Sequence, residues 1–206
     1  MRVAIFGGSF NPPHVAHVMA AVCALSLGQF ERVVVVPVFA HPFSKELAPF
    51  DHRVRMAELA MGWLPSVQIS RVEADLGGPS LTLKTLEHLQ GRHPEWQMRL
   101  VVGSDVLDDA PRWHHFEAVV RLAPLFVVGR AAAPLAGQGA SPPGEVSTPA
   151  LPAISSTELR ALLARGDDEA CRLLRTMLPA TVLAYIAQQG LYRDSAEPAP
   201  RTHHEA

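Results

Sequence analysis

Two histidines follow a pair of glycines close to the start of the chain, and this grouping could bind an anion. Gly7-Gly8 stands between a short β-like run and a helix-like run, and His14 and His17 lie three residues apart near the start of the latter. Glycines let the backbone approach a phosphate closely, and N–H groups at a helix start favour negative charge. Both histidine rings can donate to phosphoryl oxygens, so the pattern indicates a phosphate site.

On spacing alone, other interpretations of this segment remain open. A tight glycine turn with two surface histidines fits equally well. A zinc site fits less well, because two histidines need further ligands and no Cys, Asp or Glu cluster stands nearby. The segment has neither the G-x-G-x-x-G pattern of a dinucleotide fingerprint nor the G-K-[ST] pattern of a P-loop.

A second candidate anion site lies far along the chain, over residues 154–160. Ser155, Ser156 and Thr157 place hydroxyls at a predicted helix start, and Arg160 follows one turn later. A plain Ser/Thr helix cap is the alternative. The sequence shows no obvious Ser-His-Asp set or catalytic pair of carboxylates.

Alternating strand-like and helix-like runs must position these residues. The run 3–6 precedes a helix over 15–27, and a nearly continuous valine run over 32–38 is typical of a strand buried on both faces. The alternation continues with helices predicted over 50–64, 81–89 and 116–122, and strands over 67–72, 98–102 and 125–128. The pattern predicts an α/β fold, Rossmann-like and doubly wound, with a mostly parallel sheet and a ligand crevice at the carboxyl ends of its strands.

The predicted helix over 50–64 is amphipathic. Its apolar and charged residues occupy different sides, with Val54, Ala57 and Met61 on one side and Arg53, Arg55 and Glu58 on others. Such a helix packs its apolar side against a core.

Residues 1–193 are predicted to form a single domain. Residues 131–153 are rich in Pro, Ala and Gly, which indicates a flexible loop, although 145–148 could form a short strand. Residues 154–193 are predicted to form a small C-terminal helical part, with helices over 156–164, 169–177 and 180–189. The polar tail 194–206 is predicted to be disordered.

Charge and composition exclude several classes of function. The formal net charge is −2 at pH 7, so the chain lacks the cationic field of proteins that bind nucleic acid or anionic lipid nonspecifically. Two cysteines are too few for a disulfide framework or a Cys-rich zinc site, and they fit a reducing cytosol. Apolar runs end well before the ~18 residues of a membrane helix, and the first residues do not resemble a signal peptide. We therefore expect a cytoplasmic protein without nucleic-acid or membrane partners.

Residues 7–17 resemble the G-G-[ST]-F-D-P-x-H-x-G-H signature of the nucleotidyltransferase α/β-phosphodiesterase superfamily, and specifically of the bacterial nicotinate mononucleotide adenylyltransferases. Asn11 stands for the usual Asp, and Ala16 for the usual Gly. Residues 154–160 are similar to the second signature of that family, I-S-S-T-x-[IL]-R. Further similar segments are F-x-x-R-x-x-M-x-x-L-A from residue 50, G-P-S-Y-T over 78–82, G-x-D…W over 103–113, and Y-I-x-x-x-G-L-Y over 185–192.

The resemblance implies that the protein transfers AMP from ATP to the 5′-phosphate of nicotinate mononucleotide, yielding deamido-NAD and pyrophosphate. Mg²⁺ would accompany ATP, held mainly by substrate phosphates and water rather than by protein ligands. A homo-oligomer is left open.

The resemblance also implies a set of site residues. The catalytic residues, all directed at phosphates, are His14, His17, Lys45 and Arg160, with His17 on the α-phosphate. The ATP-binding residues are Gly7, Gly8, Ser9, Phe10, Gly103, Asp105, Ile154, Ser155, Ser156 and Thr157. The acceptor-binding residues are Thr82, Trp113 and Arg130. In this assignment the carboxylate of Asp105 accepts from ribose hydroxyls, and Trp113 stacks on the pyridine ring.

Three of these residues have simpler interpretations. Lys45 could be a solvated loop residue, because residues 41–45 read H-P-F-S-K where the family commonly has P-P-H-[KR]. Asp105 could cap a helix, and Trp113 could be a partly buried core residue.

Departures on the acceptor side leave alternatives for the function. Leu81 replaces the usual Tyr, and two alanines replace the Pro-Gly that commonly follows the residue at Arg130. One alternative is a related adenylyl- or cytidylyltransferase that uses nicotinamide mononucleotide, phosphopantetheine or another phosphorylated acceptor. The other is a noncatalytic nucleotide-binding module.

Overall fold

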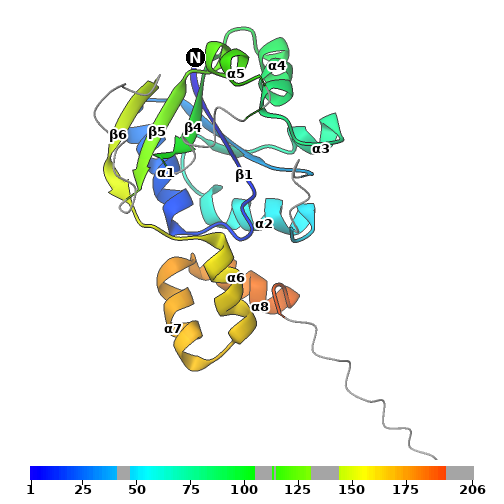
Figure 1. Ribbon diagram of the computed structural model, residues 1–206, viewed down its shortest axis with the longest axis vertical. Coiled ribbons are helices and arrows are strands. Elements are labelled where there is room, and N and C mark those ends of the chain that lie inside the picture. Colours follow the sequence, from blue (N-terminus) through cyan, green and yellow to red (C-terminus); the bar gives the residue numbers. More distant parts are fainter. Residues whose placement is uncertain (41–46, 105–112, 114, 131–143, 194–206) are drawn as a thin grey trace, which may run out of the picture.

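The computed structural model describes residues 1–40, 47–104, 113, 115–130 and 144–193. They form a twisted sheet with helices on both faces, and a group of helices from the C-terminal part lies beyond one end of the sheet (Figure 1). This arrangement confirms the predicted α/β class.

The helices and strands follow the predicted runs closely. The strands are β1 (Arg2–Gly8), β2 (Arg32–Pro37), β3 (Val67–Ile69), β4 (Gln97–Gly103), β5 (Leu125–Arg130) and β6 (Gly144–Leu151). The helices are α1 (Val15–Ser26), α2 (Phe50–Met61), α3 (Val72–Leu76), α4 (Thr82–Arg92), α5 (Phe116–Leu122), α6 (Ser156–Arg165), α7 (Asp168–Met177) and α8 (Ala180–Gln189). The predicted strand over 67–72 is shorter than expected, because a helix, α3, begins at its last residue. None of the described helices is long and apolar enough to cross a membrane.

The first strand of the chain lies in the interior of the sheet. The order of the strands decides where a ligand can bind. The strand order is β3-β2-β1-β4-β5-β6, and each neighbouring pair is parallel. The chain therefore runs outward to β3, returns beside β1, and runs outward again to β6. A doubly wound sheet opens a crevice at such a point of return, at the carboxyl ends of its strands. Gly7 and Gly8 end β1 and Gly103 ends β4, so both segments reach this edge.

The valine run of β2 is buried on both faces, as predicted. Val33 and Val35 belong to the core on the side of α1 and α2, whereas Val34 and Val36 belong to the core on the side of α4 and α5 (Figure 1). The residues that α1 buries are small: Ala16, Ala20, Ala21, Cys23 and Ala24. Small side chains let the start of α1 lie close to the sheet, next to the end of β1.

The structure corrects part of the prediction of a flexible loop over 131–153. Residues 144–151 form β6, which extends the short strand held as the alternative and pairs in parallel with β5. The local sequence gives little sign of β6 because its position depends on hydrogen bonds to β5. An edge strand pairs on one side only, so it tolerates Pro149. Residues 131–143 and the tail 194–206 lie outside the described residues.

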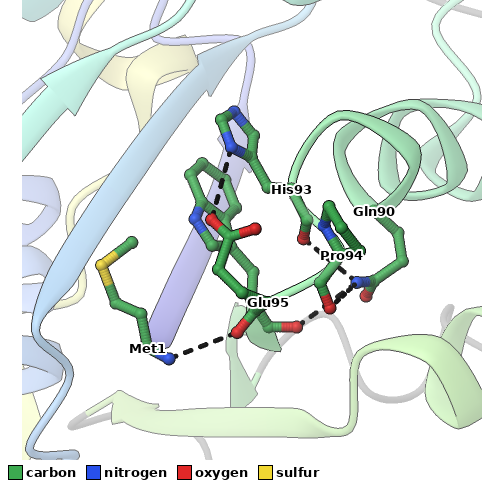
Figure 2. A network of polar contacts seen from close by, with 6 residues as sticks. Met1, Gln90, His93, Pro94 and Glu95 are labelled. Carbon is green, nitrogen blue, oxygen red and sulfur yellow. Dashed lines mark hydrogen bonds and ion pairs between the residues drawn. The ribbon is translucent and has the colours of Figure 1, made fainter.

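At the opposite edge of the sheet, the connection between α4 and β4 holds the N-terminus (Figure 2). The Met1 ammonium donates to the carbonyl of Glu95 at 3.2 Å, and the amide of Gln90 donates to the carbonyl of His93 at 3.2 Å. The His93 ring stacks on Trp96, with centroids 3.9 Å apart. The contact between Met1 and Glu95 joins the start of β1 to the segment that leads into β4, at the amino ends of both strands.

Candidate active site

The segment between β1 and α1, residues 7–17, is called the phosphate loop below. A Cβ added at Gly7 would meet nothing within 4 Å, whereas a Cβ at Gly8 would lie 3.0 Å from the ring of Phe10. Phe10 is buried and has φ 47, in the left-handed region that a bulky residue rarely adopts. Its ring packs edge-on against Phe6, with centroids 5.4 Å apart, and burial there holds the strained turn in place. The backbone at Gly7 therefore borders open space at the carboxyl edge of the sheet.

The two predicted histidines lie together at the start of α1. Their ring centroids are 3.8 Å apart; His14 is buried and His17 is half-buried. The backbone N–H of His14 donates to Nδ1 of His17 at 3.1 Å. Because Nδ1 accepts this bond, the ring proton of neutral His17 lies on Nε2, the nitrogen that can donate to a phosphate oxygen.

The second predicted anion site, residues 154–160 at the start of α6, lies against the phosphate loop. Ser155 caps α6 by accepting from the N–H of Thr157 at 3.2 Å. The hydroxyl of Ser156 donates to the carbonyl of Pro12 at 3.1 Å, across 144 residues of sequence. The structure thus brings together two motifs that the sequence places at opposite ends of the domain.

Arg160 strengthens this junction. One nitrogen of its guanidinium, Nη1, donates to the carbonyl of Asn11 at 2.9 Å and to the carbonyl of Ser156 at 3.1 Å. The other, Nη2, donates to the hydroxyl of Thr157 at 3.3 Å. The side chain is half-buried, so its charge lies at the surface where the two helix starts meet.

The position of Arg53 corrects the amphipathic pattern predicted for α2. The sequence pattern puts Arg53 among the charged residues away from the apolar side, yet the residue is 1% exposed. Its guanidinium donates to three carbonyls at 3.1 Å or less: Ala48 at 2.8 Å, Ser9 at 3.1 Å and Val38 at 2.6 Å. A single cation therefore ties the phosphate loop to the end of β2 and to the start of α2.

The electrostatics of Arg53 follow from this burial. Removal from water lowers the pKa of the Arg53 guanidinium, and the neighbouring Tyr192 and Glu73 oppose that shift. Periodicity could not identify the role of Arg53, because its partners are backbone carbonyls from distant segments. The one available signal was its place in the F-x-x-R-x-x-M-x-x-L-A pattern.

The turn that precedes α4 is joined to the end of β2. The N–H of Phe39 is shared by Oε2 of Glu73 at 3.0 Å and the hydroxyl of Ser80 at 2.9 Å. Glu73 is buried and also accepts from the hydroxyl of Thr85 at 3.2 Å. These bonds fix the start of α4, and with it half-buried Thr82, near the carboxyl end of β2.

The other predicted residues are placed unevenly. Trp113 is half-buried and packs against the core on the side of α4 and α5, with its ring edge-on to Phe116 at 6.4 Å. Three predicted site residues lie outside the described part of the structure: Lys45, Asp105 and the side chain of Arg130. Among the residues that are described, no group of three or more His, Cys, Asp or Glu could hold a metal ion.

Comparison with known proteins agrees with this arrangement. A family model described as cytidylyltransferase-like matches residues 5–162. The chain is 47% identical over 196 residues to a probable nicotinate-nucleotide adenylyltransferase of Anaeromyxobacter dehalogenans (strain 2CP-C), covering 93% of this chain and 97% of that protein. It is 38% identical to the protein of the same name from Myxococcus xanthus, covering 93% and 95% of the two chains.

A solved structure has the same fold. It is the Plasmodium falciparum nicotinic acid mononucleotide adenylyltransferase complexed with NaAD, with a TM-score of 0.77 and 20% sequence identity. The match covers 93% of this chain and 97% of the other. At this identity the likeness supports the fold.

Proposed function

The chain belongs to the cytidylyltransferase-like family and, within it, to the nicotinate-nucleotide adenylyltransferases, and from this membership we propose that it transfers AMP from ATP to nicotinate mononucleotide. The products are deamido-NAD and pyrophosphate. One observation carries the proposal at the level of the site. Ser156 and Arg160 bond the carbonyls of Pro12 and Asn11, so two anion-binding helix starts form one surface, as a reaction between two phosphate esters requires.

The reaction itself needs little covalent help from the protein. A phosphate oxygen of the acceptor attacks the α-phosphorus of ATP, the bond from that phosphorus to the bridging oxygen breaks, and the electron pair leaves on pyrophosphate. The attacking phosphate is already an anion at neutral pH, so no general base is required. Catalysis then depends on aligning two anions and stabilising the charge that builds on the α-phosphate and the leaving group.

The described residues suit these tasks. Nε2 of His17 donates to an α-phosphate oxygen, and His14 and the N–H groups at the start of α1 bind the neighbouring phosphates. The guanidinium of Arg160 adds positive charge at the junction of the two helix starts. The open space beside Gly7 lets a phosphate approach the backbone. In this proposal Lys45 supplies a further cation.

The nucleosides occupy either side of these phosphates. Gly103 and Asp105 follow β4 and bind the adenosine, while Trp113 stacks on the pyridine ring and Thr82 helps to bind the acceptor. Arg130, at the end of β5, contacts phosphate. The half-buried ring of Trp113 supports its part, because one face of a partly exposed indole can contact a ligand.

In this proposal Mg²⁺ is part of the substrate, the Mg–ATP complex. An ion bound mainly by phosphate oxygens and water needs no cluster of protein ligands. Mg²⁺ contributes by neutralising charge on the ATP phosphates.

An assay of pyrophosphate release with a panel of acceptors tests the proposal. Purified protein is incubated with Mg–ATP and, separately, nicotinate mononucleotide, nicotinamide mononucleotide and phosphopantetheine. We expect release with nicotinate mononucleotide at a rate well above the other two. Release with none of them would refute the enzymatic function, and turnover with the amide alone would refute the preference for the acid.

A further inference from the structure

We propose that the hydroxyl of Tyr192 is a positioning group for the phosphate loop and acts through Asn11, an inference that rests on the proposed adenylyl transfer. The two residues are 181 positions apart in sequence, yet the hydroxyl donates to Oδ1 of Asn11 at 2.7 Å. Neither residue is among the predicted site residues. The contact links the turn after the last helix to the first loop of the protein.

Asn11 is a junction between several segments. It is 1% exposed, and its Oδ1 accepts from the backbone N–H of Ala48 at 3.1 Å as well as from Tyr192. Its own carbonyl accepts from Arg160. An amide oxygen has two lone pairs, so these two donors saturate Oδ1. Because a backbone N–H can only donate, the bond from Ala48 requires oxygen at that position, and the phenol of Tyr192 must therefore donate to it.

The backbone around Tyr192 is shaped to make this contact. Helix α8 ends at Gln189 and is capped by Gly190, and the N–H of Leu191 bonds back to the carbonyl of Ile186 at 3.1 Å. Tyr192 itself has φ 62, a left-handed conformation that costs a non-glycine residue roughly 1 kcal/mol or more. Such strain persists where surrounding contacts over-determine the position. The hydrogen bond from the Tyr192 phenol to buried Asn11 is one such contact.

The charges around Tyr192 come from side chains that bond the same loop. Burial raises the pKa of the Tyr192 phenol above its ordinary value, against the opposing effect of Arg160 and Arg53. The phenol therefore remains a donor at neutral pH. The two arginines bond the carbonyls of Asn11 and Ser9 respectively, and Ser156 bonds the carbonyl of Pro12. Tyr192 is therefore one of several side chains that hold the phosphate loop.

A shift of Asn11 would reach the two histidines through a short segment of the chain. Asn11 lies three residues before His14, and the segment between them is buried. The N–H of His14 in turn orients the ring of His17. A misplacement of about 1 Å at a reacting group can lower a rate about 100-fold. Loss of one anchor out of several should cost less, and we expect about tenfold, the effect of one ordinary hydrogen bond.

The test compares two substitutions that each remove one hydroxyl. Tyr192→Phe removes the donor to Asn11. Tyr185→Phe is the matched control, because the hydroxyl of Tyr185 contacts Nδ1 of His52 at 2.8 Å and lies on α8 of the same helical part. We expect Tyr192→Phe to lower kcat/KM for ATP about tenfold, with KM for the acceptor and the circular dichroism spectrum unchanged. The control should retain the wild-type rate.

Two further measurements separate positioning from a merely structural role. Replacement of Tyr192 with 4-aminophenylalanine restores an N–H donor and should restore most of the lost rate. Equal kcat/KM values for Tyr192→Phe and Tyr185→Phe, or no rescue by the amino derivative, would overturn the inference. Inactive wild-type protein would instead count against the proposed function. In that event the Kd for ATP, measured by calorimetry on the same proteins, decides the inference: weaker binding in Tyr192→Phe alone supports it, and equal binding overturns it.

Discussion

Replacing Arg53 with lysine keeps the positive charge but removes the branched guanidinium group, which bonds three segments of the chain. The Arg53 guanidinium donates hydrogen bonds to the carbonyls of Ala48, Ser9 and Val38. A fourth, longer bond of 3.4 Å reaches the carbonyl of Phe39. Lysine has one nitrogen, which cannot reach all of these positions at once. Arg53→Lys should therefore leave buried carbonyls without a donor.

The size of the effect follows from the contacts. Two of the three short bonds are lost if the ammonium stays near one segment. Hydrogen bonds to a charged group are worth about 1.5–3 kcal/mol each. Losing two of them, at the smaller value, should lower the free energy of unfolding by about 3 kcal/mol. For a chain of this size that corresponds to a decrease in Tm of about 6–12 °C.

Thermal unfolding followed by circular dichroism measures this change, with Arg55→Lys as the matched control. Arg55 lies two residues further along α2, is half-exposed, and pairs with Glu58 on the surface at 2.9 Å. Exposed pairs contribute about 0–1 kcal/mol, so the control should barely shift Tm. If Arg53→Lys and Arg55→Lys unfold at the same temperature, the interpretation of Arg53 as a buried tie between segments is wrong.

Three predictions concern the site itself. His17→Ala should lower kcat by roughly 10²–10³ with the fold intact, as expected for a lost donor to a developing charge; near-normal turnover in steady-state kinetics would remove His17 from its role. Trp113→Ala should raise KM for the mononucleotide about tenfold or more and leave KM for ATP unchanged, whereas equal changes in both would identify Trp113 as a core residue. Gly7→Ala should fold normally but bind ATP about tenfold or more weakly in calorimetry, because its methyl group enters open space beside the phosphates; Gly91→Ala, whose methyl group also meets no neighbour, is the control and should leave ATP binding unaffected.

Local pattern was sufficient for the central part of the fold. The valines of β2 identified a strand buried on both faces because hydrophobicity on both sides of a strand is written into consecutive residues. The positions of α1 and α6 followed from runs bounded by glycine or by helix-capping hydroxyls. The sequence indicates β6 only as a short alternative over 145–148, because an edge strand that depends on β5 for its hydrogen bonds needs little β character of its own.

The candidate site was proposed from residues whose own chemistry suits a phosphate. The types of His14, His17 and Arg160 and their places at predicted helix starts single them out, and their roles stay a prediction. Arg53 and Tyr192 do not stand out in the sequence, because their contacts are with distant partners: one bonds carbonyls of three segments, and the other bonds Asn11 from the far end of the chain. Spacing along the sequence does not encode such contacts.

The fate of the α-phosphate of ATP is the most direct test of the transfer of AMP to nicotinate mononucleotide. Mg–ATP labelled at the α-phosphate is incubated with nicotinate mononucleotide, and the products are separated and identified by mass. We expect the label to appear in deamido-NAD, in equal amount to unlabelled pyrophosphate. A nucleotide-bound protein that forms no labelled dinucleotide, or one that transfers a terminal phosphate instead, would contradict it.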